Sequence, residues 1–245
     1  MENKGYTAHI GFLYPGHAAE DDYPRLARMV RPVADIQVVH TSFVEDAHTV
    51  EALTEMGSPT RLIEGATRLR DSGIEAVLWT STSASFVRGL DGIREQIDTL
   101  EKALQVPAST TAMAFARAVT AVNAHRVAIA ATYPADVASL FQGFLEHFDI
   151  EVVGLASHGI ATAAEAGTLG KDAVLRFARE NNHPRADALL IPDTALHSAS
   201  WLKELEAVAG KPVLTANQVS FWEGLRLCGK LTPQRGLGTL FATEL

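Results

Sequence analysis

The sequence has almost no cysteine. Cys228 is the only one among its 245 residues, so no disulfide can form within the chain. A chain without disulfides fits a reducing compartment, and we therefore expect the protein to be cytoplasmic. Because Cys228 stands late in a predicted helix, we expect it to be buried and inert rather than nucleophilic.

Signals for a membrane or for nucleic acid are missing as well. No apolar run reaches the roughly 18 residues that a transmembrane helix needs. The first residues, Met1-Glu2-Asn3-Lys4, lack the basic and apolar segments of a signal peptide. The net charge is −8, with both signs scattered along the chain, which argues against a phosphate backbone or a lipid surface. We expect no nucleic-acid and no membrane partner.

Metal-binding motifs are also absent from the sequence. The nine histidines form no HxH and no HxxxH pair, so no local spacing brings two imidazole ligands together. The sequence therefore predicts no metal site.

Short apolar runs alternate with amphipathic stretches along the chain. Hydrophobic residues make up 47% of it and charged residues 20%, which allows a full core. The runs are near-continuous, as in strands buried on both faces of a parallel sheet. The predicted strands are His9–Tyr14, Ile36–His40, Ala76–Thr80, Arg126–Ala131, Glu151–Leu155, Ala188–Ile191 and Pro212–Leu214, and the predicted helices include Thr60–Ser72, Leu90–Leu104, Ala135–Phe148, Ala173–Asn181 and Ala199–Ala209. Repeated strand–helix–strand units predict an α/β fold.

Polar residues follow the strands at similar spacings in the two halves of the chain. The six segments are Tyr14-Pro15-Gly16, Thr80-Ser81-Thr82-Ser83, Ser109-Thr110-Thr111, Thr132-Tyr133-Pro134, Pro192-Asp193-Thr194 and Thr215-Ala216-Asn217. Along the sequence, the separation between Pro15 and Ser81 is similar to that between Tyr133 and Asp193. This similarity indicates an internal duplication. We expect residues 1–114 with 216–245 to form one lobe and residues 115–215 to form the other.

The ends of parallel strands are the usual ligand-binding edge of such sheets. A small polar residue there also caps the following helix, whose free N–H groups and positive dipole end attract an anion. Any single one of these residues is better explained as a helix cap. Six such segments in one chain favour a shared ligand, a small carboxylate held between the lobes.

Ser81 and Asp193 are the strongest candidates for chemistry. Ser81 lies in a hydroxyl-rich segment, Thr80-Ser81-Thr82-Ser83-Ala84-Ser85, which is either a helix cap or a cradle of hydroxyls and amides for a carboxylate. Asp193 follows the apolar strand Ala188–Ile191, where it is either a helix cap or a general acid or base.

Other polar side chains at strand ends are candidates for binding. Tyr133 could donate a hydrogen bond to an oxyanion or could pack over the junction between the lobes, and Asn217 has the same two interpretations. A second proton-transfer group could come from a histidine near a strand end, although each is better explained as a residue of the rim: His17, His158 or His197.

Taken together, these segments resemble the aspartate/glutamate racemase superfamily, in its branch of arylmalonate decarboxylases and maleate cis-trans isomerases; some ectoine-utilisation proteins look similar. The resemblance covers nearly the whole chain. It rests on Gly11-Phe12-Leu13-Tyr14-Pro15, Thr82-Ser83-Ala84-Ser85-Phe86-Val87-Arg88-Gly89, Arg126-Val127-Ala128-Ile129-Ala130-Ala131-Thr132-Tyr133 and Phe221-Trp222-Glu223-Gly224-Leu225-Arg226-Leu227.

The resemblance implies two Rossmann-like (flavodoxin-like) halves related by pseudo-twofold symmetry, with the active site in the cleft between them. It implies no metal, no organic cofactor and a homodimer. Racemases and maleate isomerases of the superfamily carry one cysteine after the third strand of each half, and the decarboxylases keep only the second. Those positions correspond here to Ser81 and Asp193, so both cysteines are replaced.

The carboxylate-binding positions of the family match better. Pro15, Thr82, Ser83 and Tyr133 match by residue type, Asn217 matches the isomerase-like pattern, and the candidate set also includes Thr194. Two-base racemisation needs a proton-transfer group on each face of a carbon, and a serine hydroxyl is too weak an acid for that role. Addition to a double bond needs a thiolate. Proton transfer on one face of the carbon, by Asp193, remains possible after the replacement of both cysteines.

Three hypotheses follow. The first is a cofactor-independent lyase or isomerase acting beside a carboxylate, similar to arylmalonate decarboxylase, with racemase or maleate-isomerase activity as an alternative. The second is a carboxylate-binding protein that lost catalysis together with both cysteines. The third, a hydrolase with a Ser81–His17–Asp193 triad, is weaker because the chain has no GxSxG segment.

Overall fold

Two four-stranded parallel sheets form the centre of the molecule. The computed structural model describes residues 7–242, so the N-terminal residues on which the expectation about a signal peptide rests lie outside it. The strand orders are β2-β1-β3-β4 and β6-β5-β7-β8, so each position in one sheet has an equivalent in the other. This arrangement confirms the predicted α/β fold built from two similar halves.

The first sheet comprises β1 (His9–Pro15), β2 (Asp35–Thr41), β3 (Ala76–Trp79) and β4 (Ala108–Thr110). Its chain also forms α1 (Asp22–Met29), α2 (Val50–Met56), α3 (Pro59–Leu69), α4 (Ser83–Phe86), α5 (Gly89–Leu104) and α6 (Thr111–Ala121). Every residue of β3 is buried, as expected for a central strand between two layers of helices.

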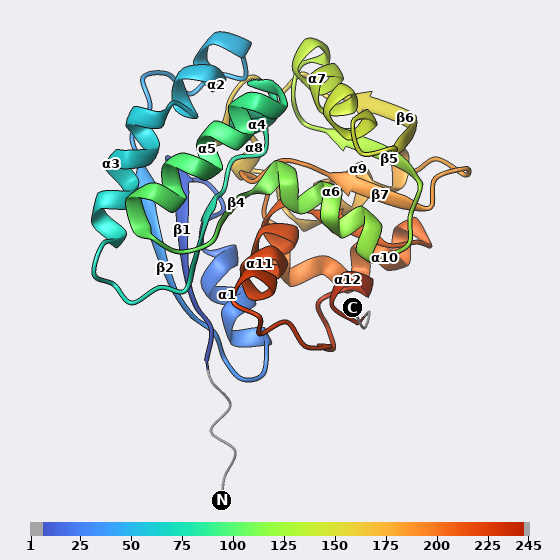
Figure 1. Cartoon of the computed structure of the whole chain (residues 1–245). Helices are drawn as coiled ribbons and strands as arrows, with labels where there is room; N and C mark the ends of the chain where they lie inside the picture. The colour runs from blue at the N-terminus through green and yellow to red at the C-terminus, as the bar shows by residue number, and fades with distance from the viewer. Residues whose placement is uncertain (1–6, 243–245) are drawn as a thin grey trace, which may run out of the picture.

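The second sheet comprises β5 (Arg126–Ala131), β6 (Glu151–Ser157), β7 (Ala188–Ile191) and β8 (Val213–Thr215). Its helices are α7 (Ala135–Glu146), α8 (Ala163–Gly167), α9 (Lys171–Glu180) and α10 (Leu202–Ala209), the last preceded by the 3₁₀ turn η1 (Ala199–Trp201). Two helices follow, α11 (Ala216–Leu227) and α12 (Thr239–Ala242). In Figure 1 the blue strands β1 and β2 of the first sheet lie on the left, and the yellow-to-orange strands β6 and β7 of the second sheet lie on the right.

Helix α11 connects the two halves. It follows β8 of the second sheet and packs against β1 and β3 of the first, because Gly224 lets its backbone approach Ile10 and Leu78; a Cβ at Gly224 would lie 2.9 Å from Ile10 Cγ2. Helices α6 and α11 lie side by side in the middle of the molecule (Figure 1). The exact lobe boundaries, 1–114 with 216–245 and 115–215, stay a prediction.

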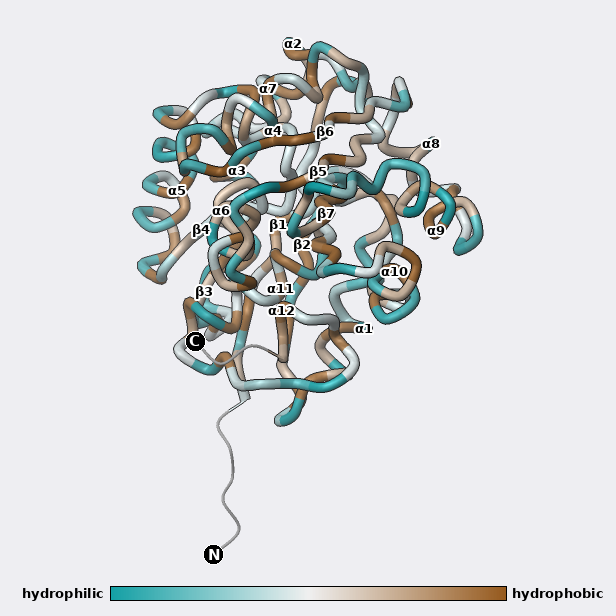
Figure 2. The backbone as a smooth tube through the Cα atoms, turned by 90° about the vertical axis from the view of Figure 1, so that its right-hand side faces the viewer, coloured by the Kyte–Doolittle hydropathy of each residue, from teal (hydrophilic) through white to brown (hydrophobic). Residues whose placement is uncertain are grey.

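Buried apolar side chains from both halves form a shared core. One cluster of buried side chains includes Phe12 and Leu78 of the first sheet and Ile129 and Leu190 of the second, and a smaller one lies between the second sheet and helices α9 and α10. Helices α5 and α10 carry both hydrophilic and hydrophobic turns in Figure 2, as helices with one buried face do. Within residues 7–242, no helix has the length and apolar character to cross a bilayer.

Candidate functional site

A small cavity lies at the carboxyl ends of the central strands of both sheets. Its volume is about 50 Å³. Five of the predicted site residues line it, and they come from the end of β1 and from the segments that follow β3 and β7: Pro15, Ser81, Ser83, Asp193 and Thr194. The two sheets therefore bring Ser81 and Asp193 to one cavity, as the duplicated pattern predicts.

Asp193 is held in place by two hydrogen bonds. Only 4% of the residue is exposed. The hydroxyl of Thr132 donates to its Oδ2, and the backbone N–H of Ala195 donates to its Oδ1 at 2.9 Å. The second bond closes a local turn rather than capping a helix, because the next helical residues begin only at Ala199. The Thr132 hydroxyl can donate to a carboxylate or accept from a carboxylic acid, so the pair suits a group that both takes and gives a proton.

The segment that carries Ser81 faces Asp193 across the same cavity. The Oγ of Ser81 accepts a bond of 3.3 Å from the N–H of Ala84, so its hydroxyl proton is available to a ligand. Helix α4, which begins at Ser83, has only four residues. A helix this short has only a weak dipole, so the positive helix end expected there from the sequence contributes little. The hydroxyls and local N–H groups of the segment are the donors that remain.

Thr82 and Tyr133 lie behind the cavity wall rather than in it. The hydroxyl of Tyr133 donates to the carbonyl of Pro192 at 2.6 Å, in the loop that carries Asp193. Thr82 is completely buried, and its Oγ1 has no hydrogen-bond partner in the described part of the chain. Both residues contact the polar loops without lining the cavity.

Asn217 does not reach the cavity. Its amide nitrogen donates to Asp22 Oδ2 at 3.2 Å, and its oxygen accepts from the hydroxyl of Tyr23 at 3.1 Å. The strand ends at β4 and β8 serve as helix caps instead: Thr110 accepts from the N–H of Met113, and Thr215 is part of a capping box. At these two of the six segments, the structure confirms the alternative that the polar residue is a helix cap.

Three polar residues of the cavity were not among the predicted site residues: Tyr14, which lies in one of the six polar segments, and Asp46 and His48, which do not. Tyr14 donates to the carbonyl of Thr194 at 3.0 Å and accepts from the N–H of Ala19. His48 is buried, and its Nδ1 lies 2.8 Å from the carbonyl oxygen of Ile160. A carbonyl only accepts, so Nδ1 carries the hydrogen and Nε2 keeps the lone pair. No strand end marks His48 in the sequence, since it lies in the loop between β2 and α2.

That loop also joins the two halves over the cavity. The Oδ1 of Asp46 accepts from the N–H of Ala163 at 2.9 Å and its Oδ2 accepts from the N–H of Ala164 at 3.1 Å. The N–H of His48 donates to the carbonyl of Ala161 at 2.8 Å. The same loop and α2 also contribute apolar side chains that line the cavity: Phe43, Leu53 and Met56.

Burial controls the ionisation of the two phenols near Asp193. It raises the pKa of Tyr14 and of Tyr133 well above the usual value of 10.0, and the negative charge of Asp193 adds to both shifts. Both side chains therefore remain neutral hydrogen-bond donors at physiological pH.

The three histidines considered from the sequence lie in different places. His17 lines the cavity at its exposed side, and its Nδ1 is 3.2 Å from Glu20 Oε1. His197 pairs with Asp21 and His158 with Asn181, and neither histidine lines the cavity. Because His17 pairs with Glu20 rather than with Asp193, the arrangement does not fit a triad. Within the described residues one group of side chains could hold a metal ion: His17, Glu20 and His40.

Comparisons with known proteins agree with this architecture. Residues 47–241 match the family model described as arylmalonate decarboxylase. An arylmalonate decarboxylase from Bordetella bronchiseptica is 29% identical over 187 residues, which cover 74% of this chain and 76% of the relative.

Solved structures of two enzyme groups superpose on this chain. A double mutant of arylmalonate decarboxylase in a liganded form has a TM-score of 0.84 at 24% identity and covers 96% of this chain and 99% of its own. The maleate isomerase Iso from Pseudomonas putida S16 has a TM-score of 0.87 at 20% identity, with 97% and 99% coverage. At these identities the structural likeness establishes the two-lobed fold.

Proposed function

Because the chain belongs to the arylmalonate decarboxylase family, we propose that it is a cofactor-independent lyase or isomerase acting at the carbon next to a carboxylate of a small organic acid. The observation that carries the proposal is the meeting of Ser81 and Asp193, from equivalent loops of the two sheets, at one cavity. Membership in the family supports decarboxylase- or isomerase-type chemistry.

The hydroxyl groups of Ser81 and Ser83 hold the carboxylate in this proposal. Both residues are nearly fully buried and line the cavity, where neutral donors stabilise an anion more strongly than in water. Thr82 and Tyr133 position this segment and the loop of Asp193, and Asn217 fixes α11 against Asp22.

Asp193 transfers the proton. In the lyase reaction the bond between the α-carbon and one carboxyl group breaks, carbon dioxide leaves, and its electron pair forms an enediolate on the remaining carboxyl. Protonated Asp193 then gives its proton to the α-carbon, and its carboxylate is reprotonated from solvent. In the isomerase reaction Asp193 instead removes the α-proton, which leaves an enediolate, and a second donor such as solvent returns a proton to the opposite face of that carbon. The Thr132 hydroxyl contacts Asp193 in either form.

The cavity volume favours a small aliphatic acid. A cavity that holds benzene measures about 150 Å³, whereas this one measures about 50 Å³. An arylmalonate would enter only if the loop that contains Phe43 and His48 moved away from α8. A short-chain malonate needs less space beside Leu53 and Met56.

A second candidate is a carboxylate-binding protein without catalysis. The replacement of both family cysteines by Ser81 and Asp193 favours it, since a thiolate is missing from each half. Racemase or maleate-isomerase activity is the third candidate and would need His48 or another group to replace the second base.

The test follows a panel of acids by NMR: methylmalonate, phenylmalonate, maleate and both enantiomers of aspartate. We expect methylmalonate to lose carbon dioxide and Asp193→Asn to abolish the loss while calorimetry still detects binding of the acid. His197→Ala, a change outside the cavity, serves as the matched control with retained turnover. Binding without turnover of any acid would identify the binding protein, and neither binding nor turnover would refute both candidates.

A further inference from the structure

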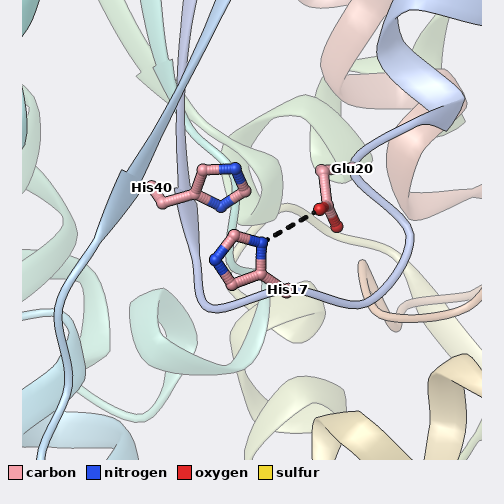
Figure 3. A group of neighbouring side chains, drawn as sticks. All are labelled: His17, Glu20 and His40. Atoms are coloured by element: carbon pink, nitrogen blue, oxygen red, sulfur yellow. Dashed lines mark hydrogen bonds and ion pairs between the residues drawn. The ribbon is translucent and has the colours of Figure 1, made fainter.

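We propose that His17, Glu20 and His40 form a binding site for a divalent transition-metal ion of the Zn²⁺ type, at the exposed side of the cavity. Each residue offers one ligand atom, and the three atoms lie within 4.8 Å of one another. Figure 3 shows the two imidazole rings stacked beside the carboxylate of Glu20. Metal binding at this site does not depend on the proposed reaction.

Strand pairing brings the ligands together. His40 lies near the end of β2, directly opposite Tyr14 of the neighbouring strand β1. The chain turns after β1 at Gly16, and His17 then lies over His40, with ring centroids 3.9 Å apart and planes inclined by 30°. Glu20 follows in the loop before α1. The ligands come from separate strand ends, which is why no HxH or HxxxH spacing marks them.

Hydrogen bonds already orient the ligand atoms. The Nδ1 of His40 lies 2.5 Å from the carbonyl oxygen of Gly16, so it carries the hydrogen and leaves Nε2 with its lone pair. A ring N–H bonded to a backbone carbonyl is the usual second contact of a histidine that binds a metal. The N–H of Ala18 donates to Glu20 Oε2 at 2.8 Å and leaves Oε1 beside His17. Arg68 donates to the backbone carbonyl of His40 rather than to its ring.

The distances and the exposure suit a metal with an open position. Tetrahedral Zn²⁺ with bonds of about 2.0–2.1 Å places its ligand atoms roughly 3.3 Å apart, and the His17–Glu20 pair is already at 3.2 Å. The side chain of His17 is 74% exposed, so it can rotate to close the remaining gap. Solvent would supply the fourth ligand.

The donor set identifies the class of metal. Two imidazole nitrogens and one carboxylate oxygen suit Zn²⁺, Cu²⁺, Ni²⁺ or Co²⁺, whereas Mg²⁺ and Ca²⁺ prefer oxygen ligands throughout. Since His17 also lines the cavity, the ion would add positive charge beside the place where a carboxylate is proposed to bind.

Isothermal titration calorimetry with ZnCl₂ on the metal-free protein tests the site, and Co²⁺ absorption reports the geometry. We expect one Zn²⁺ per chain and no heat with MgCl₂. His17→Ala and, separately, His40→Gln should weaken Zn²⁺ binding by at least about tenfold, since even changes in the outer shell of metal sites cost that much.

His147→Ala is the matched control. His147 is exposed, and its Nδ1 lies 2.7 Å from the carbonyl of Gly143, but it belongs to no group of metal ligands within residues 7–242. We expect it to bind Zn²⁺ as the wild type does. Absence of stoichiometric Zn²⁺ binding, binding that survives both His17→Ala and His40→Gln, or equal loss in His147→Ala would overturn the proposal. His17→Ala alters an exposed side chain, so circular dichroism should show an unchanged fold.

Discussion

Single side chains at the ends of β3 and β7 define the candidate site. Ser81 and Asp193 each stand two residues beyond their strand, so the internal symmetry of the chain places a neutral hydroxyl opposite an ionisable carboxyl. One proton-transfer group on one side of a carbon suits decarboxylation or exchange better than two-base racemisation. His48 is a further polar residue of the cavity, and its Nδ1 lies 2.8 Å from the carbonyl oxygen of Ile160.

Cys228 provides a test at the scale of one residue. The thiol is half-buried rather than fully buried, and burial raises its pKa from 9.0 to about 11. Since the thiolate is the reactive form, we expect alkylation by iodoacetamide at pH 8 to be roughly a hundredfold slower than that of a free cysteine. The rate should rise steeply toward pH 11. Fast alkylation at pH 8 would show that Cys228 is a reactive thiol and not the inert residue we expect.

Helices differ in how well their sequences reveal them. The predicted stretches Leu90–Leu104 and Ala173–Asn181 agree closely with α5 and α9 because each of these helices has one buried and one exposed face. Helix α11 gives no such signal, since all its residues from Ala216 to Leu225 are buried.

Helix α2 packs so closely on α4 that the addition of a single methyl group between them should push them apart. A Cβ at Gly57 would lie 2.2 Å from the carbonyl oxygen of Ala84, a backbone atom next to the Ser81–Ser83 segment. We expect Gly57→Ala to lower the free energy of unfolding by about 1–3 kcal/mol through overpacking, measured by urea denaturation, and to weaken acid binding.

The control is a glycine within α7. A Cβ at Gly143 would meet no atom within 4 Å, so Gly143→Ala should be neutral or should stabilise the protein by roughly 0.5–1 kcal/mol, the usual helical gain. Equal effects of the two substitutions would show that α2 does not press on α4 in solution.

At the scale of the whole molecule, buried polar contacts hold the halves together around the cavity. Asp22 on α1 accepts from the N–H groups of Ser198 and Ala199, at the start of η1, at 2.8 and 3.1 Å. Sequence patterns predicted the two sheets and the cavity between them from strand ends alone. They could not predict Asp22 or Asp46, whose partners lie far away in the sequence and depend on how the halves pack.

Asp22 should make stability depend on pH. Burial raises its pKa above the usual 3.8, and hydrogen bonds from Ser198, Ala199 and Asn217 offset the shift only in part. A carboxyl with a higher pKa in the folded state binds its proton more tightly there, so stability falls as pH rises from about 4 through the folded pKa. Asp22→Asn removes this titration.

Urea denaturation at a series of pH values from 4 to 7 measures the effect. We expect the free energy of unfolding of the wild type, relative to that of Asp22→Asn, to decrease as the pH rises through this range. Parallel pH profiles of the two proteins would contradict the assignment of a perturbed carboxyl to the junction between the halves.

The most direct measurement of the central claim is deuterium incorporation at the α-carbon, followed by ¹H NMR in D₂O with methylmalonate as the added acid. The wild type should yield propionate with one deuterium per molecule, since Asp193 in D₂O delivers one deuteron as carbon dioxide leaves. Asp193→Asn should bind the acid and yield no deuterated product. Undiminished formation of deuterated propionate by Asp193→Asn would contradict the account, because some group other than Asp193 would then deliver the proton.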